Sequence, residues 1–125
     1  MFDIIEFTVP GRAPATMSPN ARKSWHQKHA AGTEYGDLVF CAAWCSIPSG
    51  FGHAWQRARV TVTQCAVRLR DGDNFLSSFK AGLDAIVRAG ILMDDKPSCV
   101  EVITVKHQKV KHESEEKVVV RVERL

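Results

Sequence analysis

Apolar and polar residues alternate along several segments of the chain in a way that is typical of half-buried β-strands. The four predicted strands cover residues 3–9, 59–70, 100–106 and 117–124. In the second of them the apolar phase changes between Val62 and Cys65, which a β-bulge near Gln64 would explain. The polar stretch between the last two strands is most simply a long hairpin connection.

Two further segments have the three- to four-residue spacing of apolar side chains that predicts amphipathic helices. The first covers residues 33–47, with Thr33 in the place of an N-terminal cap, and the second covers residues 74–89, with Gly90 in the place of a C-terminal cap. The apolar stripe of the second helix consists of Phe75, Phe79, Leu83, Ile86 and Val87. Together these elements predict a single small α+β domain over residues 1–125, with a mixed sheet of about four strands and two main helices packed on it.

A polar segment, residues 10–32, separates the first strand from the first helix. Loops of this length are uncommon in compact domains unless they are mobile or bind something. From Arg12 to His29 the segment contains no acidic residue, and Trp25 among its bases is available to lie on a nucleobase or a sugar. The basic residues are Arg12, Arg22, Lys23 and Lys28. A solvated surface loop would have the same composition, so this segment alone favours neither interpretation.

The composition is that of an ordinary soluble protein, since 45% of the 125 residues are apolar and 25% are charged. A net charge of +3 is too small to identify a nucleic-acid-binding protein by itself. No stretch approaches the roughly 20 apolar residues that cross a bilayer, and the first residues lack the features of a signal peptide. We therefore expect a cytoplasmic protein without a membrane partner. The four cysteines match no common zinc pattern and are expected to be reduced and mostly buried.

Two pairs of aspartates carry the candidate chemistry. Asp71 and Asp73 follow the second predicted strand, so in an extended chain both side chains would point to the side that faces the core. Asp94 and Asp95 follow the second helix, and the return of the chain to the next strand can bring them beside the first pair. Carboxylates held close together repel one another unless a cation offsets their charge, and a hard divalent ion such as Mg²⁺ is the natural partner.

Both patterns also have a purely structural interpretation. The stretch Asp71, Gly72, Asp73 and Asn74 suits a turn with a helix cap. Lys80, Asp84 and Arg88 recur at four-residue spacing and could form a ladder of surface ion pairs. The residue pattern leaves these alternatives open.

The run RDGDNFLSSFKAGLDAIVRAGILMDD, residues 70–95, resembles the RusA family of Holliday-junction endodeoxyribonucleases. Members of that family have a strand ending in Asp-x-Asp-Asn, a helix with a lysine, then Ala-Gly, a few apolar residues and Asp-Asp. The resemblance implies a RusA-like fold in which Asp71, Asp73 and Asp95 are Mg²⁺ ligands and Lys80 is the catalytic lysine. In this chain the lysine lies about three residues further along the helix, a shift that turns a helix by about 300° and advances it by about 4.5 Å.

The resemblance implies a Mg²⁺-dependent endodeoxyribonuclease that resolves four-way DNA junctions by paired phosphodiester hydrolysis in recombination or repair. Because such a junction has near two-fold symmetry, a homodimer would present two equivalent sites to it. The residues expected to contact DNA are Arg12, Arg22, Lys23, Lys28, Arg68 and Arg70, and those expected to support the ligands are Asn74, Asp84 and Asp94. Two alternatives remain: a nuclease of the same fold that acts on other branched DNA, and an inactive protein that only binds junctions.

Overall fold

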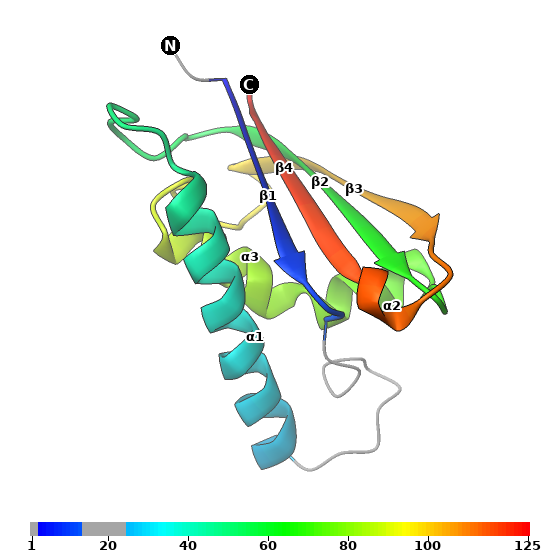
Figure 1. Cartoon of the computed structure of the whole chain (residues 1–125). Coiled ribbons are helices and arrows are strands. Elements are labelled where there is room, and N and C mark those ends of the chain that lie inside the picture. The colour runs from blue at the N-terminus through cyan, green and yellow to red at the C-terminus, as the bar shows by residue number, and fades with distance from the viewer. Residues whose placement is uncertain (1–2, 14–24) are drawn as a thin grey trace.

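A computed structural model shows a four-stranded mixed sheet with its helices on one side (Figure 1). The structure describes residues 3–13 and 25–125, and in the second range it describes side chains from residue 32 onward. The elements are β1 (Ile4–Pro10), α1 (Trp25–Ser46), β2 (Ala58–Ala66), α2 (Gly72–Ser78), α3 (Lys80–Arg88), β3 (Val100–Lys109), a 3₁₀ turn (Glu113–Glu115) and β4 (Lys117–Arg124). The expected α+β class with about four strands is confirmed.

The strands lie in the order β1-β4-β2-β3. β4 pairs antiparallel with both β1 and β2, whereas β2 and β3 are parallel and are joined by a crossover through α2 and α3. The expected hairpin between β3 and β4 is therefore wrong, because β2 lies between them. Burial explains this order: Val118, Val120 and Val122 of β4 are buried in the middle of the sheet, while β3 exposes most of its residues and forms an edge.

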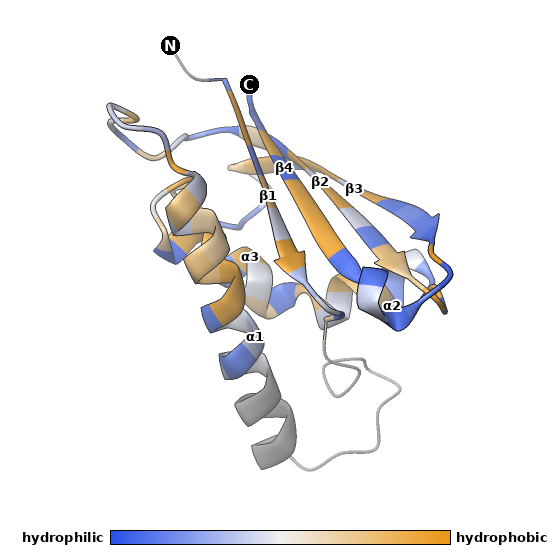
Figure 2. Cartoon of the chain, in the orientation of Figure 1, coloured by the Kyte–Doolittle hydropathy of each residue, from blue (hydrophilic) through white to orange (hydrophobic). Residues whose placement is uncertain are grey.

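The core lies between the helices and one face of the sheet. Val60, Val62, Val120 and Val122 point into it from the two central strands and are completely buried. The expected alternation of β4, with these valines inward and Arg121 outward, is confirmed. Figure 2 shows the corresponding hydrophobic stretches along β4 and along the middle of α1.

Helix α1 begins at Trp25, eight positions before the expected start at Thr33. Residues 25–32 are therefore helical, and the expected basic loop over residues 10–32 is wrong in its last third. Helix formers such as Gln, Lys and Ala in this stretch favour the extension. Arg22 and Lys23, and the side chain of Lys28, lie outside the described residues. No helix in the described part of the chain is long and apolar enough to cross a membrane.

The second predicted helix is divided into α2 and α3 at Phe79. Two contacts explain the break. The Ser78 hydroxyl donates to the Asn74 carbonyl oxygen (2.9 Å), a bond that bends helices. The Phe79 ring fills the space beside Gly82, where an added Cβ would lie 2.5 Å from a ring carbon. Gly90, with φ of 90°, follows the last helical turn in the left-handed conformation that was expected of a C-terminal cap.

All four cysteines are free thiols. Cys65 is buried and Cys99 is half-buried, but Cys41 and Cys45 are exposed. The expectation of burial is wrong for the last two because they stand one turn apart on the outward side of α1, next to the exposed Leu38.

Candidate aspartate site

Asp71 and Asp73 belong to the start of helix α2. Asp71 is the N-cap: its carboxylate accepts hydrogen bonds from the backbone nitrogen of Asn74 (2.9 Å) and from the Asn74 side-chain amide (2.8 Å). Asp73 lies in the first turn, and both carboxylates are exposed. The expected placement on the core-facing side of a strand is wrong, because β2 ends at Ala66. The helix-cap interpretation of Asp71 is confirmed.

Gln64 ties the segment that follows β2 back to the sheet. There is no bulge at this residue; the inward face of β2 simply continues through a polar side chain that is 3% exposed. The Gln64 amide nitrogen donates to the Arg70 carbonyl oxygen and lies 2.6 Å from Nδ1 of His107, while the amide oxygen accepts from the Arg70 backbone nitrogen (3.2 Å). These bonds turn the chain away from the sheet and hold the residue before Asp71 in place.

Replacement of Gln64 by Leu should lower the free energy of unfolding by about 1–3 kcal/mol, because the backbone groups of Arg70 lose their partners in a half-buried position. Chemical denaturation of the variant would measure this. The matched control is Gln56→Leu, since Gln56 is exposed and should tolerate the change with little effect. Equal stability of the two variants would contradict the anchoring role of Gln64.

Two of the arginines expected to contact DNA, Arg12 and Arg70, lie close together beside this helix start, and Arg12 also binds the backbone of a third, Arg68. Nη2 of Arg12 donates to the Arg68 carbonyl oxygen (2.8 Å), and Nε of Arg12 lies 4.0 Å from the Glu116 carboxylate. Burial lowers the pKa of Arg70, and the nearby positive charge of Arg12 lowers it further. Two guanidinium groups close enough to repel one another form a favourable place for an anion such as a phosphate.

Tyr35 is a residue near this cluster that the sequence pattern did not single out. Its side chain is 3% exposed and packs edge-on against Phe79. Within the described residues its buried hydroxyl has no hydrogen-bond partner. Burial raises the pKa of Tyr35, and the charge of Arg70 opposes that rise. The residue occurs inside a helical segment of mixed composition, so no motif marked it.

Asp84, Asp94 and Asp95 form a separate acidic group at the other end of α3. The carboxyl groups of Asp84 and Asp94 lie within hydrogen-bonding reach of Asp95 and raise its pKa. The Asp94 carboxylate accepts a hydrogen bond from the backbone nitrogen of Asp95 (2.7 Å), which lowers the pKa of Asp94. Lys96 lies 3.7 Å from Asp94. The group therefore holds like charges together, and a cation would relieve their repulsion.

The two groups of aspartates are far apart within one chain. Leu92 bridges to Trp55 just before β2, whereas Asp71 follows the end of β2. Strand β2, nine residues and on the order of 25 Å long, lies between these two points, and Figure 1 shows α2 and α3 running between the two ends. In the described ranges, no three His, Cys, Asp or Glu side chains are arranged so that they could hold a metal ion. The structure thus does not bring Asp95 beside Asp71 and Asp73 in a single chain.

Lys80 is the first residue of α3 and is exposed. It has no ion pair within the part of the chain that the structure describes, and the surface ladder with Asp84 and Arg88, the structural alternative for this residue, does not form. Arg88 instead pairs with Asp37 of α1 (3.0 Å) and lies over the Phe40 ring, 4.8 Å from its centroid. Lys80 therefore remains available for another partner.

Comparison with protein-family models finds no match for this chain, and comparison with curated proteins finds none either.

Proposed function

We propose that the protein is a Mg²⁺-dependent endodeoxyribonuclease that cleaves four-way DNA junctions as a homodimer in the cytoplasm. One observation carries the proposal: the carboxyl groups of Asp84, Asp94 and Asp95 lie close together, an arrangement of like charges that a cation would stabilise. The resemblance of residues 70–95 to RusA nucleases supports it further. The proximity of the Arg12 and Arg70 guanidinium groups supports an anionic substrate.

The donor chemistry fits Mg²⁺, because every candidate ligand is a carboxylate and Mg²⁺ prefers hard oxygen ligands. Bound Mg²⁺ would act as a Lewis acid that offsets the charge growing on the phosphate and makes a water easier to deprotonate. Asp71, Asp73 and Asp95 are the proposed ligands. Asp84 and Asp94 would orient Asp95, and Asn74 would orient Asp71 through their hydrogen bonds.

Because Asp71 and Asp73 lie far from Asp95 in one chain, a complete metal site would need a second subunit. A two-fold dimer can place the helix start of one subunit, with Asp71 and Asp73, against the Asp95 group of the other. Each of its two sites would then take ligands from both subunits, so a monomer would be inactive. Paired sites related by a two-fold axis also suit the two strand cuts that resolve a junction.

In the proposed reaction a water oxygen forms a bond to phosphorus as the bond to the leaving oxygen breaks, and the proton that this water loses passes to the surrounding solvent. Arg12 and Arg70 would bind the phosphates beside the cleaved one, since both guanidinium groups lie near the start of α2. Lys80 would give a proton to the leaving oxygen or stabilise its charge.

Two other functions would use the same surface. The first is cleavage of other branched DNA, such as flaps or forks. The second is junction binding without cleavage, which the distance between the aspartate groups favours if the chain stays monomeric. A labelled four-way junction and a panel of flaps and forks, incubated with and without Mg²⁺, would separate the three. Paired Mg²⁺-dependent cuts in the junction support the proposal, and binding without cuts would overturn it.

A pH titration of metal-free protein should show Asp95 protonated above the usual range of an aspartate, because Asp84 and Asp94 lie beside it. A raised pKa means that the folded state holds this proton more tightly than the unfolded chain. The stabilising contribution is therefore present at low pH and is lost as the pH rises through the raised pKa. Saturating Mg²⁺ should lower the pKa of Asp95, since metal and proton compete for the carboxylate.

Nuclear magnetic resonance of the side-chain carboxyl carbons would follow this titration. Asp37 of α1, which pairs with Arg88 of α3, serves as the control and should not respond to Mg²⁺. An Asp95 signal that is equally insensitive to Mg²⁺ would contradict its role as a ligand.

Lys80→Ala should lower the single-turnover cleavage rate by roughly a hundredfold, about 3 kcal/mol of transition-state stabilisation, while junction binding weakens far less. Lys80→Arg should keep the charge but lose most of the rate, because arginine is a poor proton donor. Rapid-quench kinetics would measure both variants. Wild-type rates in both would remove Lys80 from the mechanism, and Arg70 or Arg88 would be tested next.

A further inference from the structure

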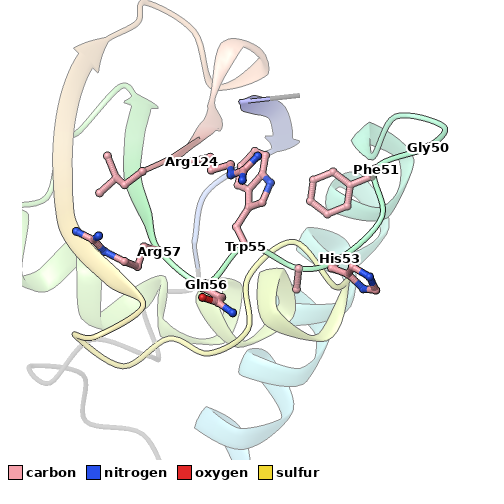
Figure 3. Close-up of a pocket in the computed structure, with 9 residues that line it drawn as sticks. Gly50, Phe51, His53, Trp55, Gln56, Arg57 and Arg124 are labelled. Carbon is pink, nitrogen blue, oxygen red and sulfur yellow. The ribbon is translucent and has the colours of Figure 1, made fainter. Parts of the chain in front are cut away.

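A pocket of about 690 Å³ opens at the end of the molecule where β2 begins and β4 ends. Figure 3 shows its walls: Phe51, His53 and Trp55 come from the segment between α1 and β2, Arg57 immediately precedes β2, and Arg124 ends β4. The volume is within the range of about 300–1,000 Å³ that is usual for small-ligand sites. Neither the aspartates nor the arginine cluster around Arg12 contributes to this lining.

Two aromatic rings line the apolar part of the pocket together with Ala54 and Leu125. The centroids of Phe51 and Trp55 lie 5.3 Å apart with a tilt of 55°. Trp55 is fixed, because its backbone nitrogen donates to the Ile91 carbonyl oxygen (2.8 Å) and its carbonyl oxygen accepts from the Met93 nitrogen (3.1 Å). Phe51 is half-buried and lies between two glycines with positive φ, so the turn that presents its ring depends on residues without a side chain. The aromatic wall is therefore built in advance of any ligand.

Positive charge lines the other part of the pocket. The Arg57 guanidinium is held by the Glu101 carboxylate, at 2.6 Å from Nη2. Arg124 is exposed, and within the described residues no carboxylate lies within salt-bridge distance of it. Unlike Arg57, Arg124 can therefore bind an anion in the pocket. His53 is exposed at the rim as a further hydrogen-bonding group.

We propose that this pocket binds one unpaired nucleotide of a DNA strand. The base would stack on the exposed side of Phe51 beside Trp55, and its phosphate would contact Arg124. Aromatic rings next to a cationic groove are the common means of binding single-stranded nucleic acid, because every base has a face that can stack. The pocket would thereby favour branched substrates that have an unpaired nucleotide near the branch.

The position of the pocket connects it to the aspartates. The segment that hydrogen-bonds to Trp55 continues from Met93 directly into Asp94 and Asp95. A strand with one nucleotide in the pocket would therefore pass near the acidic group. This last step rests on the proposed nuclease function, whereas binding of the unpaired nucleotide does not.

The test uses metal-free full-length protein, so that its outcome is independent of cleavage. The probe is a single-stranded tetranucleotide with 2-aminopurine at an internal position, whose fluorescence changes when the base stacks on an aromatic ring. We expect saturable quenching, and Phe51→Ala and Arg124→Ala should each weaken binding by about tenfold. The matched control is Arg121→Ala, which removes the same charge from the same strand on the outer face of the sheet and should change affinity less than twofold.

Two further probes identify the source of the nucleotide. A duplex with 2-aminopurine paired internally should show no such quenching, and the free 2-aminopurine nucleoside monophosphate should bind much more weakly than the tetranucleotide. Equal affinity for the free nucleotide, equal quenching of the duplex, or equal losses in Arg124→Ala and Arg121→Ala would each overturn the proposal. If Phe51→Ala is unfolded by circular dichroism, the comparison of Arg124→Ala with Arg121→Ala decides. Quenching without any Mg²⁺-dependent cleavage would support nucleotide binding in the pocket and contradict only the proposed nuclease function.

Discussion

Asp95→Asn should lower the single-turnover rate of Mg²⁺-dependent junction cleavage by about a thousandfold or more, because it removes a charged ligand on which transition-state charge balance depends. Asp71→Asn should have an effect of the same size. Asparagine caps helices as well as aspartate does, so this second variant loses the charge while it keeps the start of α2. Junction binding should be unchanged or tighter in both variants, because a negative charge near the phosphates is gone.

The matched control is Asp37→Asn, which removes a carboxylate of an exposed ion pair on α1 and should cleave at the wild-type rate. Quench-flow kinetics and binding to a labelled junction would be measured for all three variants. Binding and cleavage that fall together in folded Asp95→Asn protein, or a cleavage rate that does not fall, would contradict the metal-ligand assignment.

Much of the fold could be predicted from the sequence because its signals are local. Alternation over Val118, Val120 and Val122 predicted β4 with both bounds correct and with the right residues inward. The stripe through Phe75, Phe79 and Ile86 predicted the apolar face of the helical segment. Neighbouring strands could not be inferred in the same way, since β4 reaches its place between β1 and β2 through pairing that is distant in sequence.

The candidate site was harder to predict because one buried polar residue changes the local pattern. Gln64 continues the inward face of β2, but its amide binds the backbone of Arg70 instead of packing in the core. A pattern of apolar and polar residues cannot show such bonds, so the change of phase suggested a bulge and a strand that reached Arg70. The strand in fact ends at Ala66, and Asp71 becomes a helix cap.

The separation of Asp71 from Asp95 in the folded chain was the second feature that the sequence did not predict. The motif places Asp71 and Asp95 in one short segment, but α2 and α3 carry the chain along the sheet between them. A break at Phe79 was also not visible in the sequence, since it depends on the contact of its ring with Gly82. Sequence proximity in a motif therefore does not show whether two residues lie side by side in one chain.

A heterodimer of two variants shows whether each metal site is shared between two subunits. In a dimer of one Asp71→Asn subunit and one Asp95→Asn subunit, shared sites would place both changes in one site and leave the other site intact. Co-expression with two different affinity tags would isolate this heterodimer, and sedimentation would verify its size.

We predict that the heterodimer regains Mg²⁺-dependent nicking of a four-way junction at about half the wild-type rate per dimer, with single nicks in place of paired cuts, while each parent homodimer stays about a thousandfold slower. A heterodimer as inactive as both parents would contradict the shared site, because sites built within one chain would each carry one of the two changes.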